Sequence, residues 1–244
     1  MIEVKNLTKN FGNTHAVSDI SFVLEEGKVT GFLGPNGAGK TTTMRCMLGF
    51  EKPTSGTILI DGKPYNKLKT PLRKVGAMID SKAFHKNRSA KNHLLAIATA
   101  AGLPKNRINE VLKTVGLESA ANKKVGQFSL GMTQRVGIAA ALLGEPKILI
   151  LDEPVNGLDP EGVIWIREFC KSYAKNGGTV FISSHLMGEI ENTVDKIIII
   201  GKGKILEEGG LEEVLLRSGE ENLEKAFLNL TSSSQEFKAG NLSL

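Results

Sequence analysis

The sequence feature that most constrains the fold is the octapeptide Gly-Pro-Asn-Gly-Ala-Gly-Lys-Thr at residues 34–41. It follows the apolar run Val29–Leu33, which is typical of a buried strand, and it precedes Thr42–Leu48, a segment without helix breakers. Between a strand and a helix, this spacing of glycines and Lys-Thr predicts a loop that binds phosphate groups. A glycine-rich turn that carries a surface lysine by chance is the alternative, and the flanking strand and helix argue against it.

The residue types of this loop suit a nucleotide. Its glycines allow positive φ, so that successive N–H groups point at one anion, and the following helix adds the positive end of its dipole. We expect Lys40 to reach the β- and γ-phosphates and the hydroxyl of Thr41 to ligate Mg²⁺. The predicted nucleotide-binding residues are Gly34, Pro35, Asn36, Gly37, Ala38, Gly39, Lys40, Thr41 and Thr42.

Composition narrows the class of protein without deciding its partner. The chain has 244 residues, of which 41% are hydrophobic, and a formal net charge of +5. No apolar run approaches the roughly 18 residues of a membrane-spanning helix, and the first residues lack the pattern of a secretory signal, so we expect a cytosolic protein. Cys46 and Cys170 are far apart and have no Cys-x-x-Cys spacing, which argues against a disulfide or a zinc site. A solvated basic surface is the default explanation of the charge.

Short apolar runs alternate with helical patterns along most of the chain, which is the rhythm of a parallel sheet covered by helices. Two runs near the N-terminus, the second followed by an Asp-Gly turn, favour antiparallel strands instead, and two late runs that flank Gly-Lys-Gly favour a hairpin. The expected strands are, in chain order, Ile2–Phe11, Val29–Leu33, Thr57–Ile60, Ile148–Leu151, Thr179–Ile182, Lys196–Ile200 and Lys204–Glu208.

Helical patterns dominate the middle of the chain, between about Ser89 and Gly144. Ser89 is a typical N-cap for a helix through Ala101, which Gly102 would end. Pro104 is expected to open a second helix with one apolar face, and a third helix would begin near Ser129 and run to Leu143. A block of helices between sheet strands predicts an inserted helical subdomain. A short final helix is expected at Leu223–Leu230, before a polar tail.

The apolar run Ile148–Leu151 ends in two carboxylates, Asp152 and Glu153. Beside a phosphate loop, Asp152 is suited to hold Mg²⁺ and Glu153 to act as general base toward the attacking water. Two acidic residues that merely end a strand are the alternative, and the phosphate loop argues against it. His185 follows Thr179–Ile182 at the same expected sheet edge, where it could bond a γ-phosphate and the water, although a lone histidine is more often structural.

Ser129 and Gly131 begin the third expected helix of the middle block. They offer a hydroxyl, bare N–H groups and the positive end of a helix dipole to an anion. Taken alone this signal is weak, because serine is a common helix cap. Its position between the phosphate loop and the Asp-Glu strand makes it informative.

Together these motifs resemble a known family. In chain order they are the phosphate loop, Ser-x-Gly-x-x-Gln-Arg at 129–135, Leu-Asp-Glu-Pro at 151–154, Asn-Gly-Leu-Asp at 156–159 and Ser-His at 184–185. The sequence thereby resembles the ATP-binding subunit of ABC transporters over residues 2 to about 210. It also resembles the bacitracin- and lantibiotic-type exporter subgroup, through Ser-Leu-Gly-Met at 129–132 and Glu-Pro-Val-Asn-Gly-Leu-Asp-Pro at 153–160.

The resemblance implies an α/β fold and an assignment for further residues. The fold would be a RecA-like P-loop NTPase core with an N-terminal antiparallel β subdomain and a helical subdomain inserted at about residues 85–145. The ABC-type ATP-binding domain would span residues 1–230, followed by a polar tail at 231–244. In this family the position of Phe11 stacks on adenine, those of Ser129 and Gly131 bind the γ-phosphate held by the opposite subunit, and that of Asp159 crosses the dimer interface.

Three positions depart from the general family pattern. Leu130 replaces a glycine and Met132 a glutamine of the usual signature, but Ser129 and Gly131 remain. Asp80 ends the strand-like segment Lys74–Ile79, where most of the family has a glutamine that contacts Mg²⁺. Because aspartate is shorter and charged, we expect Asp80 to form an altered metal site, and a residue that merely ends a strand is the alternative.

The resemblance implies hydrolysis of ATP, with Mg²⁺, by a peripheral subunit at the cytoplasmic face of the cell membrane. This subunit would power a separate integral-membrane permease that exports an antimicrobial peptide, drug or lipid-like molecule, as a homodimer or with a paralogous ATP-binding subunit. A soluble ABC ATPase without a permease, for example in cofactor assembly, is the alternative. No nucleic-acid partner is expected, because the basic cluster at Lys82, Lys86, Arg88 and Lys91 has only Phe84 for base stacking.

Overall fold

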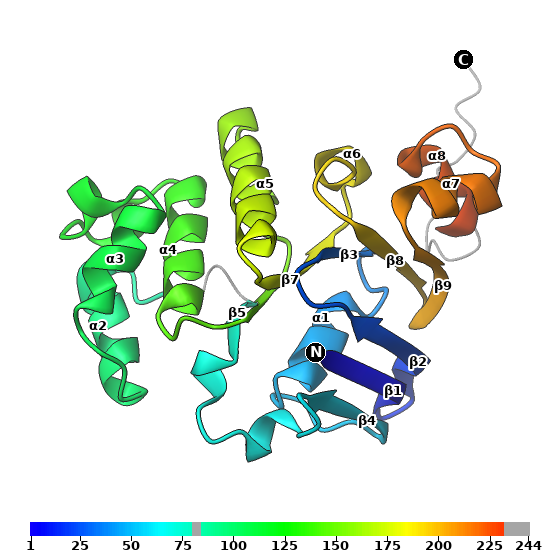
Figure 1. Ribbon diagram of the computed structural model, residues 1–244, viewed down its shortest axis with the longest axis horizontal. Coiled ribbons are helices and arrows are strands. Elements are labelled where there is room, and N and C mark those ends of the chain that lie inside the picture. Colours follow the sequence, from blue (N-terminus) through cyan, green and yellow to red (C-terminus); the bar gives the residue numbers. More distant parts are fainter. Residues whose placement is uncertain (80–83, 232–244) are drawn as a thin grey trace.

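The computed structural model describes residues 1–79 and 84–231 and has an α/β architecture with two sheets (Figure 1). The smaller sheet is antiparallel, in the order β2-β1-β4. The larger sheet has the order β5-β6-β7-β3-β8-β9, in which β9 runs antiparallel to β8 and the other neighbours are parallel. The strands are β1 Ile2–Phe11, β2 Thr14–Leu24, β3 Val29–Leu33, β4 Ser55–Ile60, β5 Val75–Met78, β6 Ile148–Leu151, β7 Thr179–Ser184, β8 Lys196–Gly201 and β9 Lys204–Gly209.

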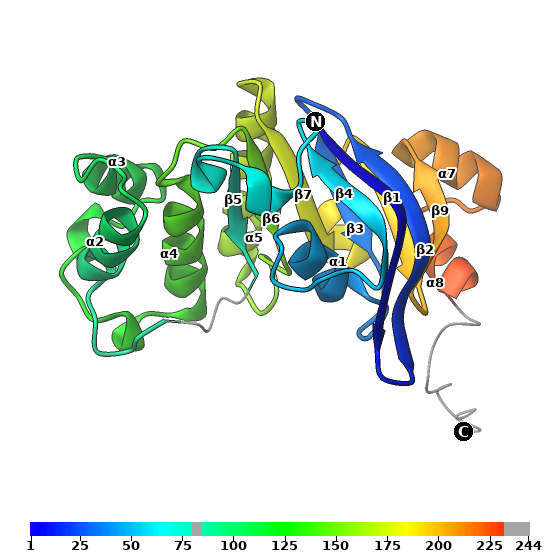
Figure 2. The same cartoon turned by 90° about the horizontal axis from the view of Figure 1, so that it is seen from below.

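Three helices of the middle block, α2, α3 and α4, lie together at one end of the molecule, away from the smaller sheet (Figures 1 and 2). The α-helices are α1 Lys40–Met47, α2 Ala90–Ala100, α3 Arg107–Thr114, α4 Leu130–Leu142, α5 Pro160–Lys175, α6 Met187–Ile190, α7 Leu211–Ser218 and α8 Leu223–Thr231. Single 3₁₀ turns lie at Tyr65–Lys67, Pro71–Arg73, Glu118–Ala120 and Val125–Gln127. None of the helices in the described ranges is long and apolar enough to cross a membrane.

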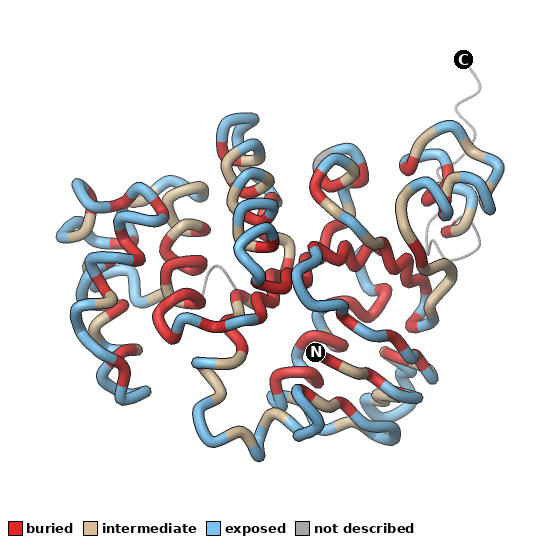
Figure 3. The backbone as a smooth tube through the Cα atoms, viewed as in Figure 1, coloured by how far each residue is buried: buried red, intermediate tan, exposed pale blue. Residues whose placement is uncertain are grey.

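The core forms on both faces of the larger sheet, whose inner strands β3, β6, β7 and β8 are almost continuously buried (Figure 3). One hydrophobic cluster joins the smaller sheet and α1 to one face, and the rings of Phe22, Phe32 and Phe181 meet there with centroids 5.1–5.9 Å apart. A second cluster joins the other face to α2–α5. This two-sided burial explains why the parallel strands are apolar runs without alternation.

Parallel pairing brings three loops to one edge of the larger sheet. Leu33 at the end of β3 lies opposite Ser184 of β7, and Leu151 at the end of β6 lies opposite Ile182 of β7. The segments after β3, β6 and β7 therefore converge at the carboxyl ends of these strands, where open α/β sheets bind ligands.

The predicted α/β fold, with an antiparallel sheet, a largely parallel sheet and a block of helices, is confirmed. Two local expectations were incomplete: β2 was not predicted, and α3 begins at Arg107 rather than at Pro104. The expected limits of the helical insertion (85–145) and of the ATP-binding domain (1–230) remain predictions. Residues 232–244 of the expected tail lie outside the described residues.

Candidate nucleotide-binding site

The loop between β3 and α1 has the geometry of an anion-binding loop. Gly37 and Gly39 have φ of 80° and 105°, a region that L side chains rarely adopt. A Cβ at Gly39 would lie 2.5 Å from the carbonyl oxygen of Ala16, and a Cβ at Gly34 would lie 2.5 Å from that of Ile200. Because backbone presses on the loop from β2 and β8, only glycine fits at these two positions.

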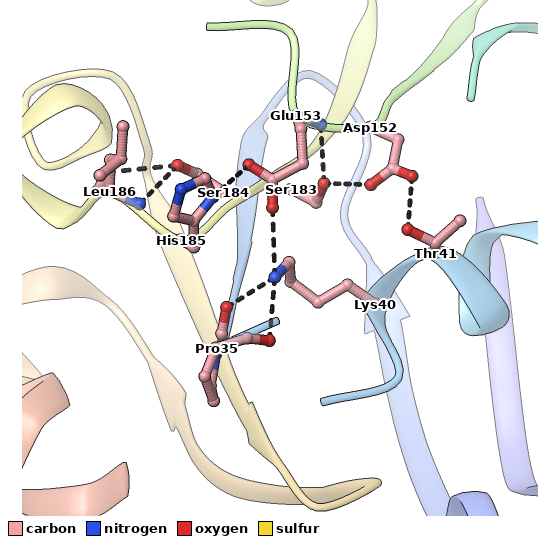
Figure 4. Close-up of polar contacts among 10 residues, drawn as sticks. Pro35, Lys40, Thr41, Asp152, Glu153, Ser183, Ser184, His185 and Leu186 are labelled. Atoms are coloured by element: carbon pink, nitrogen blue, oxygen red, sulfur yellow. Dashed lines mark hydrogen bonds and ion pairs between the residues drawn. The ribbon is translucent and has the colours of Figure 1, made fainter. Parts of the chain in front are cut away.

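Lys40 is the first residue of α1 and its side chain turns back over the loop. It is 5% exposed, and its Nζ donates to the carbonyl oxygens of Gly34 at 2.6 Å and Pro35 at 3.2 Å (Figure 4). The same Nζ forms an ion pair of 3.2 Å with Oε1 of Glu153. The ammonium group is therefore fixed above the phosphate loop, where it can meet a bound phosphate chain.

Asp152 follows β6 and accepts two hydroxyl hydrogen bonds. Thr41 Oγ1 donates to its Oδ2 at 2.7 Å, and Ser183 Oγ donates to its Oδ1 (Figure 4). Burial raises the pKa of this carboxyl group, while the bonds from Ser183 and Thr41 act in the opposite direction. The carboxylate of Asp152 and the hydroxyl of Thr41 are hard oxygen donors next to the phosphate loop, which is the ligand chemistry that Mg²⁺ prefers.

Glu153 connects Lys40 with His185. Its Oε2 accepts a hydrogen bond of 2.8 Å from Nδ1 of His185, which follows β7 (Figure 4). The φ of Glu153 is 48°, and its backbone N–H donates to Ser183 Oγ at 2.9 Å. This unusual backbone turn sends the carboxylate of Glu153 toward Lys40 while the carboxylate of Asp152 faces Thr41. We call Lys40, Thr41, Asp152, Glu153, Ser183 and His185 the phosphate-loop group.

Ser183 is a member of this group that the sequence analysis did not propose. Its hydroxyl donates to Asp152 and accepts from the N–H of Glu153, so that it fixes both carboxylate residues. The side chain is fully buried at the end of β7. A hydroxyl residue at the carboxyl end of a central strand, one strand from the phosphate loop, was the signal that could have found it.

Ser129, Gly131 and Asp159 lie together in a second place. They line a surface hollow of about 320 Å³ between the starts of α4 and α5, which we call the α4–α5 hollow. Ser129 Oγ accepts from the N–H of Met132 at 3.2 Å, and Asp159 Oδ1 accepts from the N–H of Gly162 at 2.9 Å. Each side chain thus caps its own helix, and two helix N-termini with their positive dipole ends face one hollow.

Two further predicted residues stand apart from these groups. Phe11 ends β1 with a ring that is 46% exposed, and Nζ of Lys9 lies 4.5 Å from its centroid. An exposed ring at this strand end leaves a face for a planar ligand. Asp80 lies outside the described residues, so its expected role as a metal ligand stays a prediction.

Comparisons with known proteins agree with this geometry. Residues 17–156 match the family model described as ABC transporter. The chain is 48% identical to the bacitracin transport ATP-binding protein BcrA of Bacillus licheniformis, over 85% of this chain and 69% of the relative. It is 40% identical to the lantibiotic transport ATP-binding protein SrtF of Streptococcus pyogenes, over 94% of this chain and 96% of the relative.

The fold is also similar to that of a solved cassette. The dimeric structure of the ATP-binding cassette MJ0796 in a post-hydrolysis state, bound to ADP and Pi, aligns with a TM-score of 0.75 at 28% identity. The alignment covers 86% of this chain and 99% of that one. Family model, relatives and fold agree with the phosphate loop and the carboxylates beside it: the chain belongs to the ABC transporter family as an ATP-binding subunit that hydrolyses ATP.

Proposed function

We propose that this subunit works at the cytoplasmic face of the cell membrane and powers a separate integral-membrane permease. The cargo that we propose is an exported antimicrobial peptide, drug or lipid-like molecule. Two relatives that align with most of the chain are named for the transport of bacitracin and of lantibiotics, which supports an exporter and disfavours an ABC ATPase without a permease. The observation that carries the energy-coupling role is the Lys40–Glu153–His185 arrangement on the phosphate loop.

The phosphate loop would hold the substrate ATP through its backbone N–H groups and through Lys40. In the described structure the ammonium group of Lys40 bonds two loop carbonyls and Glu153. The phosphates of ATP would replace these partners, because a polyanion offers Lys40 stronger charge-assisted hydrogen bonds. The exposed ring of Phe11 would stack on adenine.

Asp152 and Thr41 would hold Mg²⁺, which neutralises charge on the phosphates when it is bound. Glu153 would then accept a proton from the attacking water, since its carboxylate lies at the head of the phosphate loop. His185 orients this carboxylate through its Nδ1 hydrogen bond. Ser183 keeps the two carboxylates in separate roles, because it donates to Asp152 and accepts from the backbone of Glu153.

A second chain would complete each site. In the described residues no hydrogen bond or ion pair joins the α4–α5 hollow to the phosphate-loop group. We propose that Ser129 and Gly131 bind the γ-phosphate of ATP held by the opposite subunit and that Asp159 contacts that subunit. The partner is a second copy of this chain or a paralogue.

Co-expression with a multi-span membrane protein, to be sought among the genes next to the one for this chain, tests the proposed function. Cells that contain both proteins should tolerate higher concentrations of bacitracin or a lantibiotic than cells with the Glu153→Gln subunit and the same permease. In proteoliposomes the permease should raise the rate of ATP hydrolysis by the subunit several-fold. The amount of phosphate released should be proportional to the amount of cargo transported. An exporter role would be contradicted if cells with the parent subunit and cells with Glu153→Gln tolerated the drug equally and if the membrane protein did not change the rate of ATP hydrolysis.

A further inference from the structure

Helices α4 and α5 begin at two of the segments that line the α4–α5 hollow, and the third is the chain at 116–120. Ser129 precedes α4, Asp159 precedes α5, and both line the hollow together with Arg135. The distance between these two loops decides the shape that a partner meets. The contacts that fix the distance between the two loops therefore affect how the hollow binds a partner.

One contact between the two loops is apolar and lies at their tips. A Cβ at Gly157 would be 2.8 Å from Cδ2 of Leu130, and a Cβ at Gly131 would be 3.6 Å from Cδ2 of Leu158. Leu130 thus lies over the loop before α5, and Leu158 lies against the start of α4. Gly157 has a φ of 71° and leaves the space that the leucine side chain occupies.

A second contact lies further along both helices. The guanidinium carbon of Arg135 is 4.2 Å from the ring centroid of Trp165, and each residue is the sixth of its helix. Nη1 of Arg135 also donates to the carbonyl oxygen of Val115 at 3.1 Å, which holds the guanidinium plane in place. Trp165 also stacks on Phe169, with centroids 5.5 Å apart and an interplanar angle of 13°, which further restricts the orientation of its ring.

The aromatic stack continues to the strand that carries the carboxylates. Phe169 lies 5.9 Å from Tyr173 by ring centroids, and the hydroxyl of Tyr173 donates to the carbonyl oxygen of Pro146 just before β6. The Arg135–Trp165 pair therefore connects the middle block of helices with the start of β6, the strand that precedes Asp152.

We propose that Arg135 and Trp165 are positioning residues, which hold the loops at Ser129 and Asp159 at a fixed spacing so that each chain presents a preformed surface to the nucleotide of its partner. This inference rests on the proposed pairing of two chains around ATP. A preformed surface associates more tightly because less side-chain and loop freedom is lost on binding. A cation–π contact suits the task, since it constrains both position and orientation.

The test compares Trp165→Leu with Trp165→Phe, which keeps an aromatic face for Arg135. Both are made in the Glu153→Gln background, where ATP-bound dimers should accumulate, and dimerisation is measured with ATP by analytical ultracentrifugation. Trp165→Leu should raise the dissociation constant of the dimer about fivefold or more. Trp165→Phe should stay within about twofold of the parent, and ATP affinity of the monomer should be unchanged in both variants.

A double-mutant cycle with Arg135→Gln separates positioning from mere stability. The combined loss of dimerisation in Trp165→Leu with Arg135→Gln should be smaller than the sum of the two single losses, because both substitutions remove the Arg135–Trp165 contact. Trp165 is the single tryptophan of the chain, so its fluorescence emission reports the loss of Arg135 directly. The same emission shows whether Arg135→Gln is folded, which keeps the test usable if Trp165→Leu does not fold. The positioning role would be overturned if the two single losses of dimer affinity were additive, or if Trp165→Leu dimerised as tightly as the parent. Neither result would affect the proposed pairing of two chains. A parent protein that never dimerises with ATP would overturn the proposed pairing as well.

Discussion

The phosphate-loop group is held by side chains that bond one another, whereas the α4–α5 hollow is formed by caps that bond their own helices. Lys40 and Asp152 are 5% and 9% exposed, and their bonding partners lie at the ends of β3, β6 and β7 and at the start of α1, while Ser129 and Asp159 are exposed. The first group lies within one chain, and we propose that it binds a nucleotide without help from a partner. The second group offers donors without a local ligand, which is what one half of a shared site needs.

This comparison predicts that damage to the two groups has different consequences. A change in the phosphate-loop group should alter events within one chain, namely nucleotide binding and chemistry. A change around the α4–α5 hollow should alter events between chains. Each effect below tests whether the two groups differ in this way.

The largest effect is expected for Glu153→Gln. Glutamine keeps the shape of the side chain but cannot accept the proton, so ATP hydrolysis should fall about 10²-fold or more while ATP binding persists. Single-turnover phosphate release and binding of a fluorescent ATP analogue measure the two properties. Near-normal turnover would remove Glu153 from the role of general base and leave the phosphate-loop group without one.

Lys40→Ala should weaken nucleotide binding itself. The substitution removes a charge that contacts the phosphates in the ground state, so ATP affinity should fall about tenfold or more. Isothermal titration calorimetry on the monomer gives the affinity, with Lys67→Ala at an exposed position as the matched control. Unchanged affinity in Lys40→Ala would show that the loop amides alone determine binding.

Mixing two inactive variants tests whether the two groups act on one ATP in trans. Heterodimers of Lys40→Ala and Ser129→Arg chains contain one intact composite site and one doubly damaged site. With random pairing half of the dimers are mixed, so recovery of at most about a quarter of the parent rate is expected. If no mixing ratio restores hydrolysis although the chains self-associate, the two groups do not combine across an interface.

The smallest effect concerns the helices that support the α4–α5 hollow. Burial, with a smaller contribution from the charge of Arg88, lowers the pKa of His93 in α2 below its ordinary value of 6.5. The unfolded chain therefore binds this proton more readily, and the free energy of unfolding decreases as the pH falls through 6.5. Between pH 7.5 and 5.5 this group should lower Tm by about 2 °C or less.

The control for this effect is His93→Gln, which has no titrating group at the position. Differential scanning calorimetry of parent and variant across the same pH range isolates the contribution of the histidine. The parent should lose more thermal stability on acidification than the variant does. Identical pH slopes would show that protonation of His93 does not act on these helices.

The sequence was sufficient for elements whose signal is local. The predicted limits of β3 and β6 match the structure, because each is a short, mostly apolar run followed by a glycine or a carboxylate. Strand β2 was not predicted, since Asp19 adopts a φ of 53° and register shifts interrupt the pairing of β1 with β2. The start of α3 was placed too early, because Pro104 accepts a turn bond of 3.3 Å from Arg107 before the helix begins.

The polar contacts of the site follow the same rule. The motif residues Lys40, Asp152 and Glu153 were predicted because each stands at a recognisable place along the chain, and their catalytic roles remain predictions. Ser183 was not proposed, because its two bonds cross from β7 to the loop after β6. The Arg135–Trp165 contact joins residues of two separate helices, and no local sequence pattern predicts such a pair.

The ion pair between Lys40 and Glu153 has a consequence for how the subunit rests between cycles. While the ammonium group holds the carboxylate at 3.2 Å, both reactive groups are occupied with each other. If the proposed roles hold, ATP would have to break this ion pair before Lys40 could bind phosphate, so part of its binding free energy would be spent on that step. Glu153→Gln removes the ion pair, and we therefore expect this variant to bind ATP more tightly than its parent does.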